Sequence, residues 1–365
     1  MMTASRFRTV RTGIAFSLAL AFVVLVAIGL YADFPRMLVA LASFRWSFLP
    51  LILSLTLFNY CFRFFKWQYY LQRLQIRLPR LTSFLIFLSG LSMAITPGKV
   101  GELLKSYLLK RSTGEPISRT APIIMAERLS DGLAMLLLAA TGLVFYRFGW
   151  EILLILLVVG LAVILLIQHR SLSLRVLAAG ERLPVLSRLA QPLRAFYESA
   201  YTLLRWRPLL LAIAIGFLSW SGECLALYFV FLGLGVLASP DLLLKATFIL
   251  AVSSLVGSAS GLPGGLGTAD GSLLGLIRLL VSPSAVIGGA ATLLIRFCTL
   301  WFGLALGVIA FLFLRLTQYK KLFAPEPYEE GKMYFSTIVD SGTEQSEADG
   351  SYRLSRASAP LSNGE

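Results

Sequence analysis

A proline–glycine pair interrupts two separate apolar stretches of this 365-residue chain. The first interruption reads Pro97-Gly98-Lys99-Val100-Gly101-Glu102, and the second reads Pro263-Gly264-Gly265-Leu266-Gly267, with Asp270 shortly after it. Proline and glycine break helices, and a broken helix at membrane depth is tolerated only where it lines protein or a cavity. Matching breaks in two halves of a chain indicate a transport site built from a structural repeat.

Long apolar runs surround these breaks, and the composition sets the class of protein. Hydrophobic residues make up 57% of the chain and charged residues 14%, and the mean hydropathy is +0.78. These values predict an all-α, polytopic helical membrane protein. The net charge of +14 does not indicate a nucleic-acid partner, because the basic residues gather in short segments between apolar runs. There they set the topology and contact the anionic inner leaflet.

The sequence excludes several kinds of enzyme site. Cys61, Cys224 and Cys298 lie far apart in apolar segments, so they give neither a metal-binding spacing nor a disulfide framework. His169 is the only histidine, which rules out a histidine-based triad or a multi-histidine zinc site. We therefore expect no catalytic residues, no metal and no cofactor.

Hydrophobic runs predict the order of the membrane spans. We expect spans at 13–31, 47–65, 120–146, 152–167, 208–237 and 284–316, with interrupted hairpins at 82–111 and 243–281. Residues 33–46 are expected to form a short outer loop. Residues 1–320 make up the membrane domain, and 321–365, rich in Pro, Glu, Ser, Asp and Gly, are expected to be a disordered cytoplasmic tail.

Basic residues predict the orientation of the two hairpins. Segments 73–80 and 110–119 flank the first hairpin with positive charge, so both of its ends face the cytoplasm. With the N-terminus and Lys320-Lys321 also inside, the second hairpin opens outward. The halves 13–167 and 208–316 then form an inverted repeat with re-entrant hairpins. The intervals from Pro97 to Arg128 and from Pro263 to Arg296 differ by only two residues, which supports the repeat.

The basic segment 168–207 joins the two halves. Within it, 193–206 is amphipathic, with Leu193, Phe196, Tyr197, Ala200, Leu203 and Leu204 on one side. This pattern predicts a helix that lies on an anionic leaflet.

Ionisable residues occur inside several apolar spans, where they are costly unless they pair or face water. Lys66 is explained by snorkelling to the interface, whereas Arg63 lies a turn deeper and reaches toward a lipid phosphate. Two interpretations stay open for the buried charges: a network that fixes helix packing, or the wall of a binding site. The predicted substrate-binding residues are Arg63, Pro97, Gly98, Lys99, Gly101, Glu102, Glu127, Arg128, Asp131, Glu223, Pro263, Gly264, Gly265, Gly267, Asp270 and Arg296.

These residue types suit a charged lipid head group. Helix N-termini after a break present free amide groups and partial positive charge, and arginine binds phosphate through two N–H donors. The carboxylates would neutralise the arginines or hold a cationic part of the head group. The lipid tails would remain in the bilayer meanwhile.

The residues from Ser92 to Lys105, then Glu127-Arg128-Leu129-Ser130-Asp131, and then Leu262-Pro263-Gly264-Gly265-Leu266-Gly267, resemble the lysylphosphatidylglycerol synthase transmembrane region, a flippase-like family. The similarity covers about residues 10–320. It implies a membrane domain that moves aminoacylated phosphatidylglycerol between leaflets, whereas a separate soluble domain of bifunctional members makes that lipid. Since the resemblance extends only to the membrane domain, we expect no synthase activity. Asp270 stands where the resemblance leads us to expect Glu.

The expected function is lipid transport in the plasma (inner) membrane, with both termini cytoplasmic. A flippase-like protein would move a phospholipid or glycolipid head group between leaflets. One alternative is a non-catalytic membrane partner of a lipid or polysaccharide synthesis pathway. Another is a head-group-modifying enzyme that uses Glu127, Asp131 or Asp270 as acid or base. The sequence leaves a homo-oligomer open.

Overall fold

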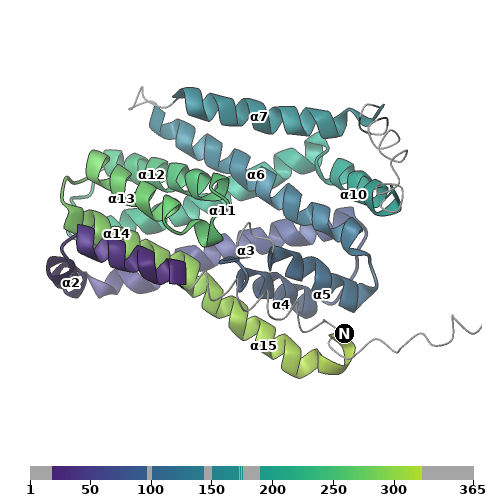
Figure 1. Ribbon diagram of the computed structural model, residues 1–365, viewed down its shortest axis with the longest axis horizontal. Helices are drawn as coiled ribbons and strands as arrows, with labels where there is room; N and C mark the ends of the chain where they lie inside the picture. The colour runs from purple at the N-terminus through teal and green to yellow at the C-terminus, as the bar shows by residue number, and fades with distance from the viewer. Residues whose placement is uncertain are drawn as a thin grey trace, which may run out of the picture. The chain divides into compact units, whose positions relative to one another are not determined.

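The computed structural model describes residues 19–96, 101–143, 150–171, 173, 175 and 190–322, and all regular elements in this part of the chain are helices (Figure 1). The predicted tail beyond Leu322 lies outside the described residues. In order, the elements are a helix at Ala19–Tyr31, α2 (Phe34–Ala42), η1 (Trp46–Phe48), α3 (Leu49–Arg73), α4 (Arg80–Leu91), α5 (Leu103–Thr113), α6 (Ile117–Leu143), α7 (Trp150–Gln168), α10 (Ala190–Leu203), α11 (Trp206–Gly233), α12 (Pro240–Ala259), η3 (Pro263–Gly265), α13 (Thr268–Leu280), α14 (Ala285–Arg296), η4 (Phe297–Trp301) and α15 (Phe302–Leu322).

Four helices in the described part are long and apolar enough to cross a bilayer, and a bent pair adds a fifth candidate. The four are Trp46–Arg73, Trp206–Gly233, Pro240–Ala259 and Ala285–Thr317, and the bent pair is Ala19–Tyr31 with Phe34–Ala42. These helices confirm the predicted polytopic helical membrane protein. The predicted loop at 33–46 was wrong, because α2 occupies most of it. Pro35 lies in the first turn of α2, and the apolar Met37 is buried in a cluster with Ile28 and Ala290.

Helices on both sides of the first break are short. At about 1.5 Å per residue, the 12 residues of α4 rise ~18 Å, whereas the hydrocarbon core is ~30 Å thick. The 20 residues of α12 suffice to cross, and the 13 residues of α13 do not. Re-entrant hairpins therefore stay a prediction. The short helix α4 is consistent with a re-entrant segment, whereas α12 is long enough to cross the bilayer.

The turns after α3 and α11 share one hydrogen-bond pattern. Gln75 and Gly235 both have positive φ, at 59° and 85°. The amide of Ile76 donates to the carbonyl of Leu71 at 2.9 Å, and the amide of Val236 donates to that of Phe231 at 3.0 Å. Left-handed residues with these bonds form Schellman caps. The two caps lie 160 residues apart in the chain, which supports the predicted repeat.

Packing between the halves is reciprocal. Helix α3 packs on α11, and there Asn59 Nδ2 donates to the Ser219 carbonyl at 3.1 Å while Ser219 Oγ donates to the Asn59 carbonyl at 3.0 Å. Helix α4 packs on α15, and α12 packs on α6. The helix before each break thus contacts a long helix of the other half.

The apolar side of α10 packs against α6, where Tyr197, Ala200 and Leu203 are buried. Helix α6 therefore covers the C-terminal part of this side, whereas Leu193 is exposed, so contact of the helix with an anionic leaflet stays a prediction. Contact between the flanking basic residues and anionic lipid stays a prediction.

The crossing of α4 and α15 depends on Gly307. A Cβ atom there would lie 2.3 Å from the Ser92 backbone nitrogen, so a larger residue forces the helices apart. Small residues allow this close approach of helices in membranes. We predict that Gly307→Ala lowers the free energy of unfolding by about 1–3 kcal/mol, the usual cost of overpacking. Thermal unfolding of the purified protein in detergent measures it.

Gly275→Ala in α13 is the matched control, because no described atom beyond its chain neighbours and its own helix backbone lies within 4 Å of the added Cβ. Equal unfolding temperatures for the two variants would contradict the close packing of α4 and α15.

Candidate functional site

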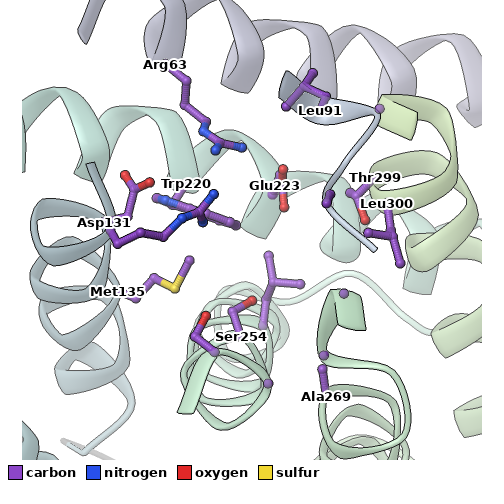
Figure 2. A pocket seen from close by; sticks show the side chains of 18 of the residues that line it. Arg63, Leu91, Asp131, Met135, Trp220, Glu223, Ser254, Ala269, Thr299 and Leu300 are labelled. Carbon is purple, nitrogen blue, oxygen red and sulfur yellow. The ribbon is translucent and has the colours of Figure 1, made fainter. Parts of the chain in front are cut away.

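The two interrupted segments meet at one cavity of about 470 Å³. Gly264 and Gly265 of the second break line it, and so do Ala94 and Glu102 on either side of the first break. A Cβ atom built on Gly264 would lie 3.5 Å from Ile95 Cγ2, so the segments are in direct contact. Figure 2 shows side chains from several helices turned toward this space.

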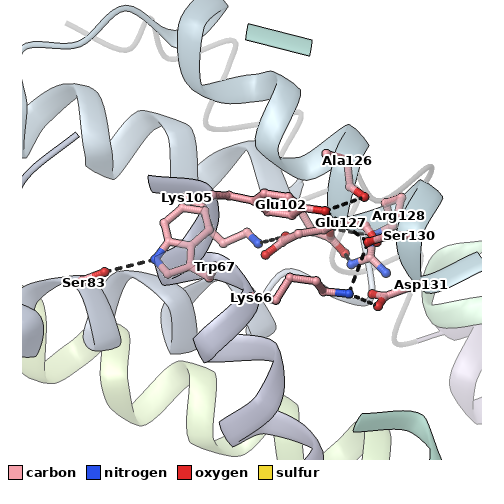
Figure 3. A network of polar contacts seen from close by, with 11 residues as sticks. Lys66, Trp67, Ser83, Glu102, Lys105, Ala126, Glu127, Arg128, Ser130 and Asp131 are labelled. Atoms are coloured by element: carbon pink, nitrogen blue, oxygen red, sulfur yellow. Dashed lines mark hydrogen bonds and ion pairs between the residues drawn. The ribbon is translucent and has the colours of Figure 1, made fainter. Parts of the chain in front are cut away.

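The first break supplies a carboxylate that binds an arginine of α6. Arg128 Nε donates to Glu102 Oε2 at 3.0 Å, and Arg128 Nη2 donates to Glu102 Oε1, so the pair is bidentate (Figure 3). The Glu102 side chain is 5% exposed, whereas that of Arg128 is 33% exposed. The guanidinium is therefore the more exposed member of the pair, and both residues line the cavity.

The second break supplies an equivalent pair with α14. Arg296 Nε donates to Asp270 Oδ1 at 2.6 Å, and Arg296 Nη2 donates to the Gly264 carbonyl at 2.9 Å. Asp270 Oδ2 also accepts the Gly267 amide at 2.8 Å, at the start of α13. The arginine thereby ties α14 to the break and to the helix after it.

The acid-to-arginine spacing is identical in both halves. Glu102 and Arg128 are 26 residues apart, as are Asp270 and Arg296. The two-residue difference in the proline-to-arginine intervals therefore arises between the proline and the acid. The equal spacing was present in the sequence, but counting from the prolines did not reveal it.

Two buried lysines complete a network at one side of the cavity, which Lys105 also lines (Figure 3). Lys66 pairs with Asp131, and Lys105 pairs with Glu127. Lys105 Nζ also lies 4.8 Å from the centroid of the Trp67 ring. The snorkelling interpretation of Lys66 was wrong, because its side chain is only 1% exposed and meets a carboxylate in the protein interior.

Sequence reasoning did not select either lysine for the site. The signal for Lys66 was its position three residues after Arg63, on the same helix face. Lys105 follows Glu102 at the same spacing. Each lysine lies three residues after a predicted site residue in an apolar segment. This position could have identified the lysines as ion-pair partners of Glu127 and Asp131.

The structure separates the predicted site residues into three groups. Those that line the cavity are Arg63, Glu102, Arg128, Asp131, Glu223, Gly264, Gly265 and Arg296. Those that lie beside or behind it are Gly101, Glu127, Pro263, Gly267 and Asp270. Pro97, Gly98 and Lys99 lie outside the described residues. Substrate binding by any of them stays a prediction.

Arg63 and Glu223 are the cavity charges for which no ion pair is found within the described part of the chain. The Arg63 guanidinium lies 6.0 Å from the centroid of the Trp220 ring, and Glu223 is 7% exposed. Asp131 Oδ2, Trp220 Nε1 and Ser253 Oγ are buried and have no hydrogen-bond partner among the described residues, and all three residues line the cavity. Buried polar atoms without partners are uncommon and mark places where a ligand or water binds.

These helices and this cavity define a multi-pass membrane protein with a charged, partly polar space between its spans. The sequence profile described as "Lysylphosphatidylglycerol synthase TM region" matches residues 14–307, so the chain belongs to this family, as its motifs predicted.

Archaeal relatives support this assignment. A UPF0104 membrane protein of Methanothermobacter thermautotrophicus is 28% identical over 255 residues, covering 65% of this chain and 72% of that protein. A UPF0104 membrane protein of Methanocaldococcus jannaschii is 26% identical over 197 residues, covering 51% of this chain and 78% of that protein.

We predict that Arg296→Ala destabilises the protein by about 3–5 kcal/mol, because it leaves the buried Asp270 carboxylate without its cation. Adding Asp270→Asn to this variant removes the unpaired charge and should restore most of the lost stability. The free energy of unfolding in detergent measures both effects.

The control is Arg36→Ala, which removes an exposed pair with Asp33 and should change stability by less than about 1 kcal/mol. A double variant as unstable as Arg296→Ala alone would contradict a cost that comes from unpaired charge.

Proposed function

We propose that this protein is a flippase-like lipid transporter of the cell membrane. It moves the polar head group of a phospholipid or glycolipid between leaflets through the cavity, while the acyl chains stay in the bilayer. The observation that carries this proposal is the contact of two interrupted segments around one charged cavity between membrane-spanning helices. The family's description, which refers to a lipid synthase, also favours a lipid over another anion.

The two arginines are suited to bind a phosphate. The hydrogen bonds of Arg128 and Arg296 to described residues use Nε and Nη2, which leaves Nη1 of each guanidinium free of partners in that part of the chain. A phosphate oxygen can accept from Nη1 while the carboxylate behind keeps its own bonds. The head group then passes from one arginine to the other without leaving either carboxylate unpaired.

The reciprocal packing of the halves supports an inverted repeat with one hairpin open to each side. In such a repeat, rocking of one half against the other exposes the same cavity to each leaflet in turn. The positive charge of the segments 73–80 and 110–119 supports cytoplasmic termini and contact with the anionic inner leaflet.

Transport in proteoliposomes tests the proposal. Fluorescent lipids are added, and chemical quenching of the outer leaflet reports how fast the inner pool becomes accessible. We predict that the wild-type protein accelerates exchange. The double variants Arg128→Ala with Glu102→Gln, and Arg296→Ala with Asp270→Asn, should slow exchange at least about tenfold, because each loses a charge-assisted contact with phosphate.

Each double variant removes a whole ion pair, so neither leaves a buried charge unpaired. The matched control removes the exposed pair, Arg36→Ala with Asp33→Asn, and should transport as the wild type does. Unchanged exchange in both cavity variants, or no acceleration of any phospholipid or glycolipid by the wild type, would refute transport.

A further inference from the structure

Arg63 and Glu223 occupy corresponding positions in the two halves but carry opposite charges. Asn59 and Ser219, which exchange hydrogen bonds where α3 crosses α11, are 160 residues apart, and so are the caps that end these helices. Arg63 and Glu223 each follow one turn after that crossing pair. The other two cavity pairs repeat with like charge, Glu102 with Asp270 and Arg128 with Arg296.

Both side chains face the cavity. Figure 2 shows Arg63 and Glu223 turned toward the same space, with Trp220 beside them. Every other cation near the cavity forms an ion pair with a carboxylate of the described residues. The pairs are Lys66 with Asp131, Lys105 with Glu127, Arg128 with Glu102, and Arg296 with Asp270. Arg63 and Glu223 therefore supply one positive and one negative charge that a ligand can engage.

Unpartnered polar atoms nearby have the same dual character. Trp220 Nε1 can only donate, and Asp131 Oδ2 can only accept while the carboxylate is ionised. Trp220 lies against Arg63, so a phosphate there would accept hydrogen bonds from both the guanidinium and the indole. An ammonium group beside Glu223 would donate to the carboxylate.

We propose that Arg63, Trp220 and Glu223 form a subsite for a zwitterionic head group, one that carries one phosphate and one ammonium group. This inference rests on the proposed function and specifies its substrate class. A purely anionic head group would satisfy Arg63 and leave the buried Glu223 carboxylate without a cation, which is costly in a low-dielectric cavity.

A head group with two ammonium groups, such as a lysyl ester of phosphatidylglycerol, would bring two cations to a subsite with one carboxylate. One ammonium group would then have no carboxylate to pair with. A zwitterion also adds no net charge to a cavity region whose described cations and carboxylates are equal in number. The subsite therefore favours an ethanolamine-type head group over both anionic and dicationic ones.

Binding of short-chain lipids to the purified full chain in detergent tests this subsite. The probes are dioctanoyl phosphatidylethanolamine, dioctanoyl phosphatidylglycerol and its lysyl ester, and the readout is the dissociation constant from thermal stabilisation. We expect the wild type to bind the ethanolamine lipid at least tenfold more tightly than either of the others. Glu223→Gln should weaken ethanolamine-lipid binding at least tenfold and leave phosphatidylglycerol binding unchanged or tighter.

Arg63→Gln should weaken all three lipids, since each carries a phosphate. If Glu223→Gln fails to fold, the double variant Arg63→Glu with Glu223→Arg replaces it. This swap keeps one positive and one negative charge in the subsite, so it should retain the preference for the zwitterion. Equal wild-type affinities, binding of none of the lipids, or a preference that survives Glu223→Gln would overturn the subsite.

The same preparations in proteoliposomes separate this inference from transport itself. A binding preference without acceleration of lipid exchange would refute transport and leave the subsite standing. Accelerated exchange without any preference would leave transport standing and overturn the subsite.

Discussion

The cost of placing charge inside a membrane protein shapes most of this structure. Two buried lysines and two partly exposed arginines each meet a carboxylate from a different helix or from a helix break. Glu102 and Asp270 come directly after helix interruptions, where backbone groups are freed and polar partners are needed. Pairing therefore neutralises the charges at the breaks, and the breaks in turn bring the arginines to a common cavity. Arg128, Arg296 and Glu102 line that cavity, whereas Asp270 lies beside it.

Much of this arrangement was predictable from the sequence. The apolar runs gave the helices, and the proline–glycine breaks with their charged neighbours gave the segments that line the cavity. The packing partners of individual side chains and helices were harder to predict from the sequence. Lys66 stands among aromatic residues near the end of an apolar run, a context typical of snorkelling, and only the fold shows that Asp131 lies opposite it. The apolar side of α10 resembled a membrane-contacting face, because a sequence pattern does not distinguish burial against lipid from burial against α6. Burial of Met37 likewise makes α2 a packed helix within the segment predicted as a loop.

Correspondence between the halves is closest where the helices cross and at the acid–arginine pairs. The caps of α3 and α11 share hydrogen bonds, and both acid–arginine spacings are 26 residues. The halves differ in the arm before the break, since α12 has 20 residues and α4 has 12. They also differ in the charge at Arg63 and Glu223. A repeat of this kind keeps the acid–arginine pairs, which preserve the packing of both halves. The charges of Arg63 and Glu223 differ between the halves and would determine which ligand the cavity binds.

Direct contact between the two interrupted segments is the central claim, and an intramolecular disulfide measures it. Ile95→Cys and Gly264→Cys are introduced after Cys61, Cys224 and Cys298 are replaced, since a Cβ on Gly264 lies 3.5 Å from Ile95 Cγ2. A protease site inserted within 176–189 then allows the halves to be cut apart after oxidation in native membranes. The structure predicts that the halves stay linked until a reductant is added, whereas either single variant separates at once. Halves that separate without reduction in the double variant would contradict the shared cavity.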